Sequence, residues 1–204
     1  MYFVEGNIGS GKSTFLKKLS TEFKVVQEPV DEWSKMKNAN GKNILEEFYE
    51  DPERNAYLFQ SIAFRSRVKN IADLKDETVI IERSIYTDRM VFAEVCKEDG
   101  NISEIEWNDY TEWFDFIVNH VGFKPKGFIY LRSVPEKSYE RINKRSRSGE
   151  SSISLDYLKK LHKRHDKWLV DEANVLVLDV TEEFESNPEL LEKMIQKVRD
   201  FVKV

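Results

Sequence analysis

The stretch 6–14 reads Gly6-Asn7-Ile8-Gly9-Ser10-Gly11-Lys12-Ser13-Thr14. It matches the pattern G-x-x-x-x-G-K-[ST] at every fixed position, follows a predicted strand at 2–5 and opens a predicted helix at 12–23. Glycines let the backbone N–H groups of such a turn point inward at phosphate oxygens. The helix N-terminus adds the positive end of its dipole. The stretch therefore predicts a phosphate-binding loop.

Two side chains of this loop carry chemistry. Lys12 is expected to bridge the β- and γ-phosphates of ATP or another nucleoside triphosphate, and Ser13 is expected to hold Mg²⁺. The alternative, a glycine-rich turn that only caps a helix, is disfavoured by the motif and its context together. The motif predicts nucleotide binding, but it identifies no acceptor and does not separate a kinase from a nucleotide-driven switch.

Short β-branched or aromatic runs alternate with longer segments of helical spacing. Fully apolar runs are typical of strands buried on both faces, as in parallel sheets. The predicted strands are 2–5, 24–27, 78–81, 127–131 and 174–178. Beyond 12–23, helices are predicted from Pro52 onward and over 88–97, 104–121, 135–144, 155–168 and 188–203. The alternation predicts one α/β domain spanning 1–204, a five-stranded parallel sheet flanked by helices.

The composition is that of an ordinary globular chain of 204 residues, 40% hydrophobic and 34% charged. The net charge of −5 argues against a surface that coats nucleic acid. The single cysteine, Cys96, excludes an intrachain disulfide and a zinc cluster. No apolar stretch approaches the ~20 residues of a membrane span. We expect a cytoplasmic protein without membrane or nucleic-acid partners, and whether a targeting peptide was removed stays open.

Acidic and basic residues follow the second and third predicted strands, where ligands of parallel sheets bind. Glu28, with Trp33 five residues on, is expected to accept a proton from an attacking hydroxyl. A capping or solvated Glu28 and a core Trp33 are the alternatives. Glu82 occupies a place suited to Mg²⁺, and the guanidinium of Arg83 suits a phosphate or an attacking oxygen. A structural ion pair is the less favoured alternative.

A basic cluster at the end of the predicted helix 135–144 precedes a Gly/Ser-rich stretch. The cluster comprises Arg141, Lys144, Arg145 and Arg147. Such a run is usually a solvated face, but a phosphotransferase must exclude water so that ATP is not hydrolysed. We therefore predict a lid at about residues 141–152.

Together the motifs resemble the deoxynucleoside kinases, a family that includes deoxycytidine, deoxyguanosine and mitochondrial thymidine kinases and the insect multisubstrate enzyme. The resemblance runs nearly end to end. It includes the loop 6–14, 27–30 with Trp33, Tyr49 with 52–54, Phe59 with Gln60, 82–86 with Asp88 and Arg89, 130–132 with Pro135 and Glu136, and Leu161 and His162 with His165, Trp168 and Leu169. One departure is Ser10, where some members have Ala; the position contributes backbone.

The resemblance implies a P-loop kinase that moves the γ-phosphoryl of ATP to the 5′-hydroxyl of a deoxynucleoside in nucleotide salvage. It implies Glu28 as general base, steadied by Arg83, with Lys12 on the phosphates. Around the substrate it implies Tyr49 and Glu150 on the 3′-hydroxyl, Gln60 on the base, and Val30, Trp33, Phe59 and Phe92 lining the base pocket. Arg141, Arg145 and Arg147 would be lid arginines, and His162, His165 and Trp168 are interpreted as packing residues.

Three positions around the base separate thymidine kinases from enzymes that take deoxycytidine and purines within this family. Here they are Ala63, Arg67 and Asp88. Ala63 and Arg67 share a helix face, and an Arg67–Asp88 pair offers hydrogen bonds to an exocyclic amino group or a ring nitrogen. The set predicts deoxyadenosine, deoxyguanosine or deoxycytidine over thymidine. The alternative is a structural salt bridge without influence on selectivity.

Two other functions stay open. A nucleoside monophosphate kinase of the thymidylate kinase type shares the loop and lid, but Glu28 would repel the phosphate of its acceptor. A P-loop switch protein needs a partner-facing switch segment and a water-positioning group, for which the sequence offers no clear candidate. The resemblance also implies a homodimer, with an apolar face expected from 88–92 and 107–116.

Overall fold

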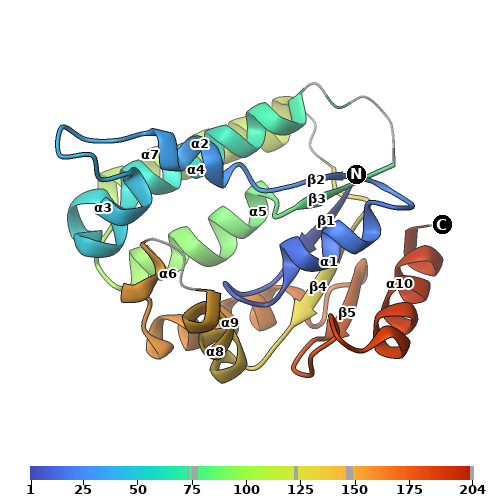
Figure 1. Ribbon diagram of the computed structural model, residues 1–204. Helices are drawn as coiled ribbons and strands as arrows, with labels where there is room; N and C mark the ends of the chain where they lie inside the picture. The colour runs from blue at the N-terminus through green and yellow to red at the C-terminus, as the bar shows by residue number, and fades with distance from the viewer. Residues whose placement is uncertain (73, 75–77, 122–123, 146–148, 203–204) are drawn as a thin grey trace.

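The computed structural model describes residues 1–72, 74, 78–121, 124–145 and 149–202. Its centre is a parallel sheet of five strands in the order β2-β3-β1-β4-β5 (Figure 1). The strands are β1 (Tyr2–Glu5), β2 (Lys24–Val26), β3 (Val79–Glu82), β4 (Gly127–Arg132) and β5 (Val175–Asp179). The predicted α/β fold is confirmed, with strand ends that differ by at most one residue from the predicted ones.

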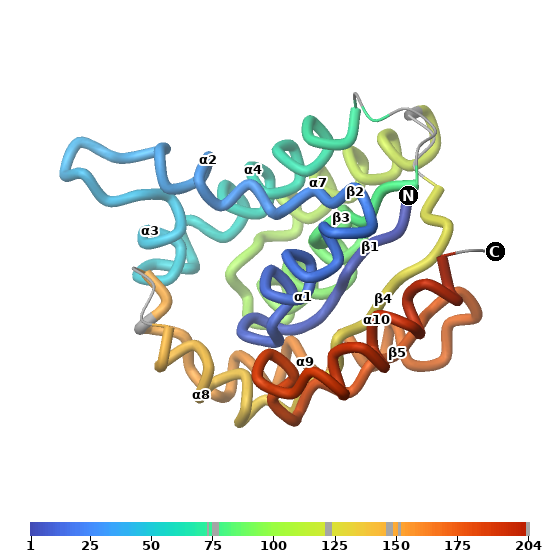
Figure 2. Tube along the Cα trace, turned by 45° about the vertical axis from the view of Figure 1, so that its right-hand side comes forward, coloured from blue at the N-terminus to red at the C-terminus, as the bar shows by residue number. Residues whose placement is uncertain are grey.

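Helices cover both faces of the sheet because successive strand side chains point to opposite sides. Phe3 of β1 belongs to the core under α4 (Pro52–Ala72) and α7 (Glu104–Phe116). Its neighbours Tyr2 and Val4 belong to the core under α1 (Lys12–Leu19) and α10 (Pro188–Val202). Figures 1 and 2 show these two helical layers on either side of the strands. The continuous apolar runs of the sequence follow from this double burial.

A third apolar cluster joins α8 (Pro135–Arg145), α9 (Leu155–Leu169) and α6 (Ala93–Glu98). In α9, His165 is fully buried and stacks on Tyr130, with ring centroids 5.9 Å apart. Trp168 packs edge-on against Phe128. These contacts agree with the packing role expected for both side chains.

The described part of the predicted lid is the end of α8 together with Gly149 and the 3-10 helix Glu150–Ser152. Gly149 lies against Glu46 of α3 (Ile44–Glu50), so the lid end and α3 are side by side (Figure 2). Arg147 lies outside the described residues. No helix of the described chain is both long and apolar enough to cross a membrane.

Several helical segments differ from the sequence prediction. The short helices α2 (Val30–Lys35), α3 and α5 (Ile85–Thr87) were not predicted. For α3 a local signal exists, because the Asn43 side chain accepts hydrogen bonds from the first turn while Glu46 accepts one from the backbone N–H of Asn43. The predicted helix 88–97 begins as a π-helix over Asp88–Phe92, and 104–121 ends as one over Ile117–Val121.

Candidate functional site

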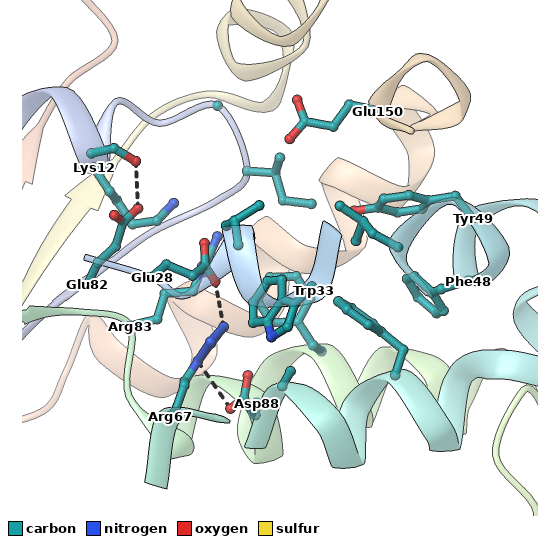
Figure 3. Close-up of a pocket in the computed structure, with 18 of the residues that line it drawn as sticks. Lys12, Glu28, Trp33, Phe48, Tyr49, Arg67, Glu82, Arg83, Asp88 and Glu150 are labelled. Carbon is teal, nitrogen blue, oxygen red and sulfur yellow. Dashed lines mark hydrogen bonds and ion pairs between the residues drawn. The ribbon is translucent and has the colours of Figure 1, made fainter. Parts of the chain in front are cut away.

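A cleft lies at the carboxyl ends of the central strands and encloses about 840 Å³, with open solvent at its mouth included. A cleft that combines apolar walls with a few polar side chains is typical of a small-molecule site. Among the predicted site residues it is lined by Ile8, Gly9, Gly11, Lys12, Ser13, Thr14, Glu28, Val30, Trp33, Tyr49, Phe59, Gln60, Ala63, Arg67, Glu82, Arg83, Asp88, Phe92, Arg145 and Glu150. Figure 3 shows Lys12 and Glu82 at one end of the cleft and Tyr49 and Glu150 at the other.

The phosphate-loop candidate has the tight backbone that its glycines predict. Gly6 and Gly9 have φ of 145° and 77°. A Cβ at Gly9 would lie 2.5 Å from the backbone oxygen of Ser138, and one at Gly6 would lie 2.6 Å from that of Leu131. The loop is thus pressed against β4 and α8, which leaves no room for side chains at these positions. Asn7 Nδ2 also donates to the backbone oxygen of Leu158 at 2.9 Å and ties the loop to α9.

Lys12 arches back over the loop. Its Nζ donates to the backbone oxygens of Gly6 at 3.2 Å and Asn7 at 2.7 Å. The pKa of Lys12 is lowered to about 7, mainly by burial and also by Arg83, while the nearby carboxylates of Glu82 and Glu28 oppose the shift. A poorly solvated ammonium of this kind gains most from a bound anion, because an anion restores what burial has removed.

Ser13 and Glu82 form the candidate Mg²⁺ position. Ser13 Oγ donates to Glu82 Oε1 at 2.9 Å, which joins the start of α1 to the end of β3. An oxygen-only pair fits Mg²⁺, which binds through few protein ligands together with phosphate oxygens and water. The described residues contain no group of three or more His, Cys, Asp or Glu side chains able to hold a metal. The pair therefore fits a metal ion that enters with nucleotide phosphates.

Glu28 lies directly after β2 between two guanidinium groups. Its Oε1 is 2.6 Å from Arg67 Nη2 and 3.3 Å from Arg83 Nε. Arg83 is buried and packs over the ring of Phe92 at 4.8 Å. Neither acid nor arginine is a solvated surface group, so the solvated alternative for Glu28 does not hold in this structure.

Arg83 has an unusual backbone that Glu5 supports. Its φ of 61° is the only positive value among the described residues other than glycine, and such conformations concentrate at functional sites. Glu5, fully buried at the end of β1, accepts from the backbone N–H of Ser84 at 2.9 Å and from the hydroxyl of Thr87. Burial raises the pKa of Glu5. Glu5 received no role from the sequence alone, although an acid at the end of an apolar strand is a local sign of a buried polar contact.

An aromatic slot forms the far end of the cleft. Phe59 packs edge-on against Trp33, with centroids 5.4 Å apart, and stacks on Phe48 at 4.9 Å. Trp33 Nε1 donates to Ser66 Oγ at 3.0 Å, so Trp33 is at once a core residue and a wall of the cleft. Leu45, Phe48 and Tyr157 also line the cleft and were not predicted.

The lid arginines take different directions. Arg145 Nη2 lies 2.6 Å from both carboxylate oxygens of Glu150 inside the cleft. Arg141, for which the resemblance implies a role in the lid, does not line the cleft in this structure. Its Nη2 donates to the backbone oxygens of Val180 at 2.9 Å and Glu182 at 3.2 Å, because the loop after β5 presents two carbonyls to one guanidinium edge.

Comparison with known proteins agrees with this arrangement. Residues 2–203 match the family model described as deoxynucleoside kinase. Deoxycytidine kinase 1 of Xenopus laevis is 35% identical in an alignment 235 residues long, gaps included. The alignment covers 98% of this chain and 89% of the relative. Deoxycytidine kinase of Homo sapiens shows the same identity and coverage. Mitochondrial deoxyguanosine kinase of Xenopus laevis is 34% identical, with 98% of this chain and 88% of the relative covered.

Proposed function

This chain belongs to the deoxynucleoside kinase family, and from that premise we propose that it transfers the γ-phosphoryl of ATP to the 5′-hydroxyl of a deoxynucleoside. One observation carries the proposal. A phosphate-binding loop, the pair of partly buried Glu28 and buried Arg83, and an aromatic slot all line one cleft. The loop accounts for the donor, the pair for activation of a hydroxyl, and the slot for a flat base.

In the proposed reaction Glu28 accepts the proton of the 5′-hydroxyl of the substrate. The 5′-oxygen attacks the γ-phosphorus of ATP, and the bond between the γ-phosphorus and the leaving oxygen of ADP breaks. Arg83 lies beside Glu28 and is placed to contact the same hydroxyl. The loop 6–14 and Lys12 hold the phosphates. Ser13 and Glu82 would hold the Mg²⁺, which would neutralise charge on the phosphates. Arg145, on the described part of the lid, closes the cleft to water.

At the nucleoside end, Tyr49 and Glu150 hold the 3′-hydroxyl in this proposal. Gln60, which is 1% exposed, makes a two-point contact with the base. Val30, Trp33, Phe59 and Phe92 provide the apolar walls. Because Arg145 binds Glu150 directly, sugar binding and lid position are linked through one ion pair.

ADP formation tests this proposal against its alternatives. We expect ADP formation from ATP in the presence of Mg²⁺ to depend on an added deoxynucleoside and not on the corresponding monophosphate, because the partly buried carboxylate of Glu28 would repel a phosphorylated acceptor. Dependence on the monophosphate would indicate a nucleoside monophosphate kinase instead. Slow ADP release that no acceptor stimulates would indicate a switch protein.

The base pocket leads to a prediction about selectivity. Arg67 Nε lies 3.2 Å from Asp88 Oδ2, beside the small Ala63. The methyl group of thymine would press on this buried pair, whereas an amino group or ring nitrogen would bond to it. We expect kcat/KM for thymidine to be ~10-fold or more below that for deoxyadenosine, deoxyguanosine or deoxycytidine, since mismatched buried polar groups cost 1–3 kcal/mol.

The matched variant replaces Arg67 with Met and Asp88 with Ala together. It should raise kcat/KM for thymidine about 10-fold relative to deoxycytidine, because both desolvated charges are gone. Arg65→Met, which removes an exposed arginine of the same helix, serves as control and should leave the ratio unchanged. A thymidine preference in the unmodified enzyme would refute this interpretation of the pocket without affecting the kinase proposal.

The exposed apolar side chains indicate which surface the proposed homodimer would use. In the segment Asp88–Phe92, Asp88 and Val91 are buried, and the exposed apolar side chain is that of Met90, which is 40% exposed. Leu58 of α4 and Trp113 and Phe116 of α7 are 47%, 56% and 48% exposed. Leu58 and Trp113 line one groove between these helices. We propose that two chains pack through this α4/α7 face.

Sedimentation at micromolar concentration should show a species of twice the chain's mass, as most homo-oligomers are two-fold. Trp113→Glu should shift it to the monomer, because a charge would be buried in an apolar contact. Val170→Glu, at an exposed apolar position after α9, should leave the dimer intact. A monomer for the unmodified chain would rule out the dimer.

A further inference from the structure

One guanidinium lies between two carboxylates with different assignments. Arg67, which is 5% exposed, extends from α4 and donates from Nη2 to Glu28 Oε1 at 2.6 Å. Its Nε lies 3.2 Å from Asp88 Oδ2. Figure 3 shows Arg67 between the two acids, with an interaction drawn to each. The residue assigned to proton transfer and a residue assigned to base choice thus share one cation.

The sharing is unequal. The contact to Glu28 is a short hydrogen bond, whereas Asp88 Oδ2 and Arg67 Nε are buried without a hydrogen-bond partner among the described residues. Burial raises the pKa of Asp88 to about 7 although Arg67 lies beside it and lowers it. Arg67 is therefore hydrogen-bonded to Glu28 but only ion-paired with Asp88, and its edge toward Asp88 keeps unused hydrogen-bonding capacity.

The following inference about catalysis rests on the proposed function. We infer that Arg67 is a positioning residue for the general base: it sets how readily Glu28 takes the proton of the 5′-hydroxyl, and Asp88 adjusts that setting by competing for the same guanidinium. A nucleobase that bonds to Asp88 or Arg67 would then influence proton uptake by Glu28 through the side chain of Arg67.

The physical reason is electrostatic. A cation in contact with a carboxylate favours its ionised form and makes it a weaker base, and a competing anion relieves that effect. Other charged and titratable groups also act on Glu28 from the surrounding elements. They are Lys12 of α1, Arg83 after β3, Asp88 of the π-helix and Tyr49 of α3. Two further acids, Glu5 of β1 and Glu82 of β3, act on Lys12 as Glu28 does. Because these groups stay in place in an Arg67 variant, a change in pH dependence reports on Arg67.

The test measures single-turnover phosphoryl transfer as a function of pH, with ATP and Mg²⁺ saturating and the enzyme in excess over its best deoxynucleoside. This isolates the chemical step. Arg67→Gln should move the rising limb of the profile to higher pH by about one unit, and Asp88→Asn should move it to lower pH. A purely structural salt bridge would leave the limb in place, and the double variant below distinguishes the route through Arg67 from the direct repulsion between Asp88 and Glu28.

Three further variants sharpen the test. Arg67→Lys should restore most of the original profile, since it keeps the charge. In the double variant Arg67→Gln/Asp88→Asn, the Asp88 substitution should have little added effect, because its route through Arg67 is gone. Arg65→Gln on the same helix should leave the profile unchanged. Shifts in the same direction, or unshifted limbs in folded variants, would overturn the inference, whereas absence of any deoxynucleoside-dependent turnover in the unmodified chain would overturn the proposed function.

Discussion

Glu28→Gln is expected to lower kcat by ~10²–10⁴-fold, the usual contribution of a positioned general base. Glutamine has nearly the same shape and its oxygen can still accept from Arg67, but it cannot take the proton of the 5′-hydroxyl. Steady-state ADP formation measures the loss. Binding of a fluorescent ATP analogue should be nearly unchanged, because the loop 6–14 and Lys12 are intact.

The matched control is Asp31→Asn, which removes an exposed acid three residues further along the chain. It should keep normal turnover. Thermal unfolding of Glu28→Gln is needed beside the kinetics, because the change leaves Arg67 and Arg83 with less compensating charge in a buried position. Turnover close to that of the unmodified chain would exclude Glu28 as the base.

The sheet and the phosphate loop could be predicted from the sequence because their signals are local. Each strand is a short apolar run, and the fixed spacing of Gly6, Gly11 and Lys12 defines the loop without help from distant residues. The positions of Glu28 and Arg83 followed from one rule of topology, that parallel strands end at the same edge. The β2-β3-β1 order then brings these residues together.

Apart from the pair of Arg67 and Asp88, which the family resemblance led us to expect, contacts between distant segments could not be predicted. The bond from Arg67 to Glu28 joins positions 39 residues apart, and the hydrogen bond from Ser84 to Glu5 joins positions 79 apart. The direction of the Arg141 side chain could not be predicted either. Its place in a basic run suggested a phosphate contact, but two carbonyls after β5 bind its guanidinium. Charge in a sequence gives no direction for a long side chain.

Lys12→Met is expected to lower kcat by ~10²–10³-fold, as loss of one preorganised charge-stabilising group does. Methionine fills similar space without the ammonium that faces the β- and γ-phosphates in the proposed reaction. Charge on the bridging and leaving oxygens grows in the transition state, so kcat should fall by a larger factor than KM for ATP rises. Lys17→Met, at an exposed position of the same helix, is the control and should change neither constant. Unfolding curves should confirm that both variants are folded. If folded Lys12→Met kept kcat within about threefold of the unmodified enzyme, a loss far smaller than such a group contributes, the assignment of Lys12 to charge stabilisation would be wrong.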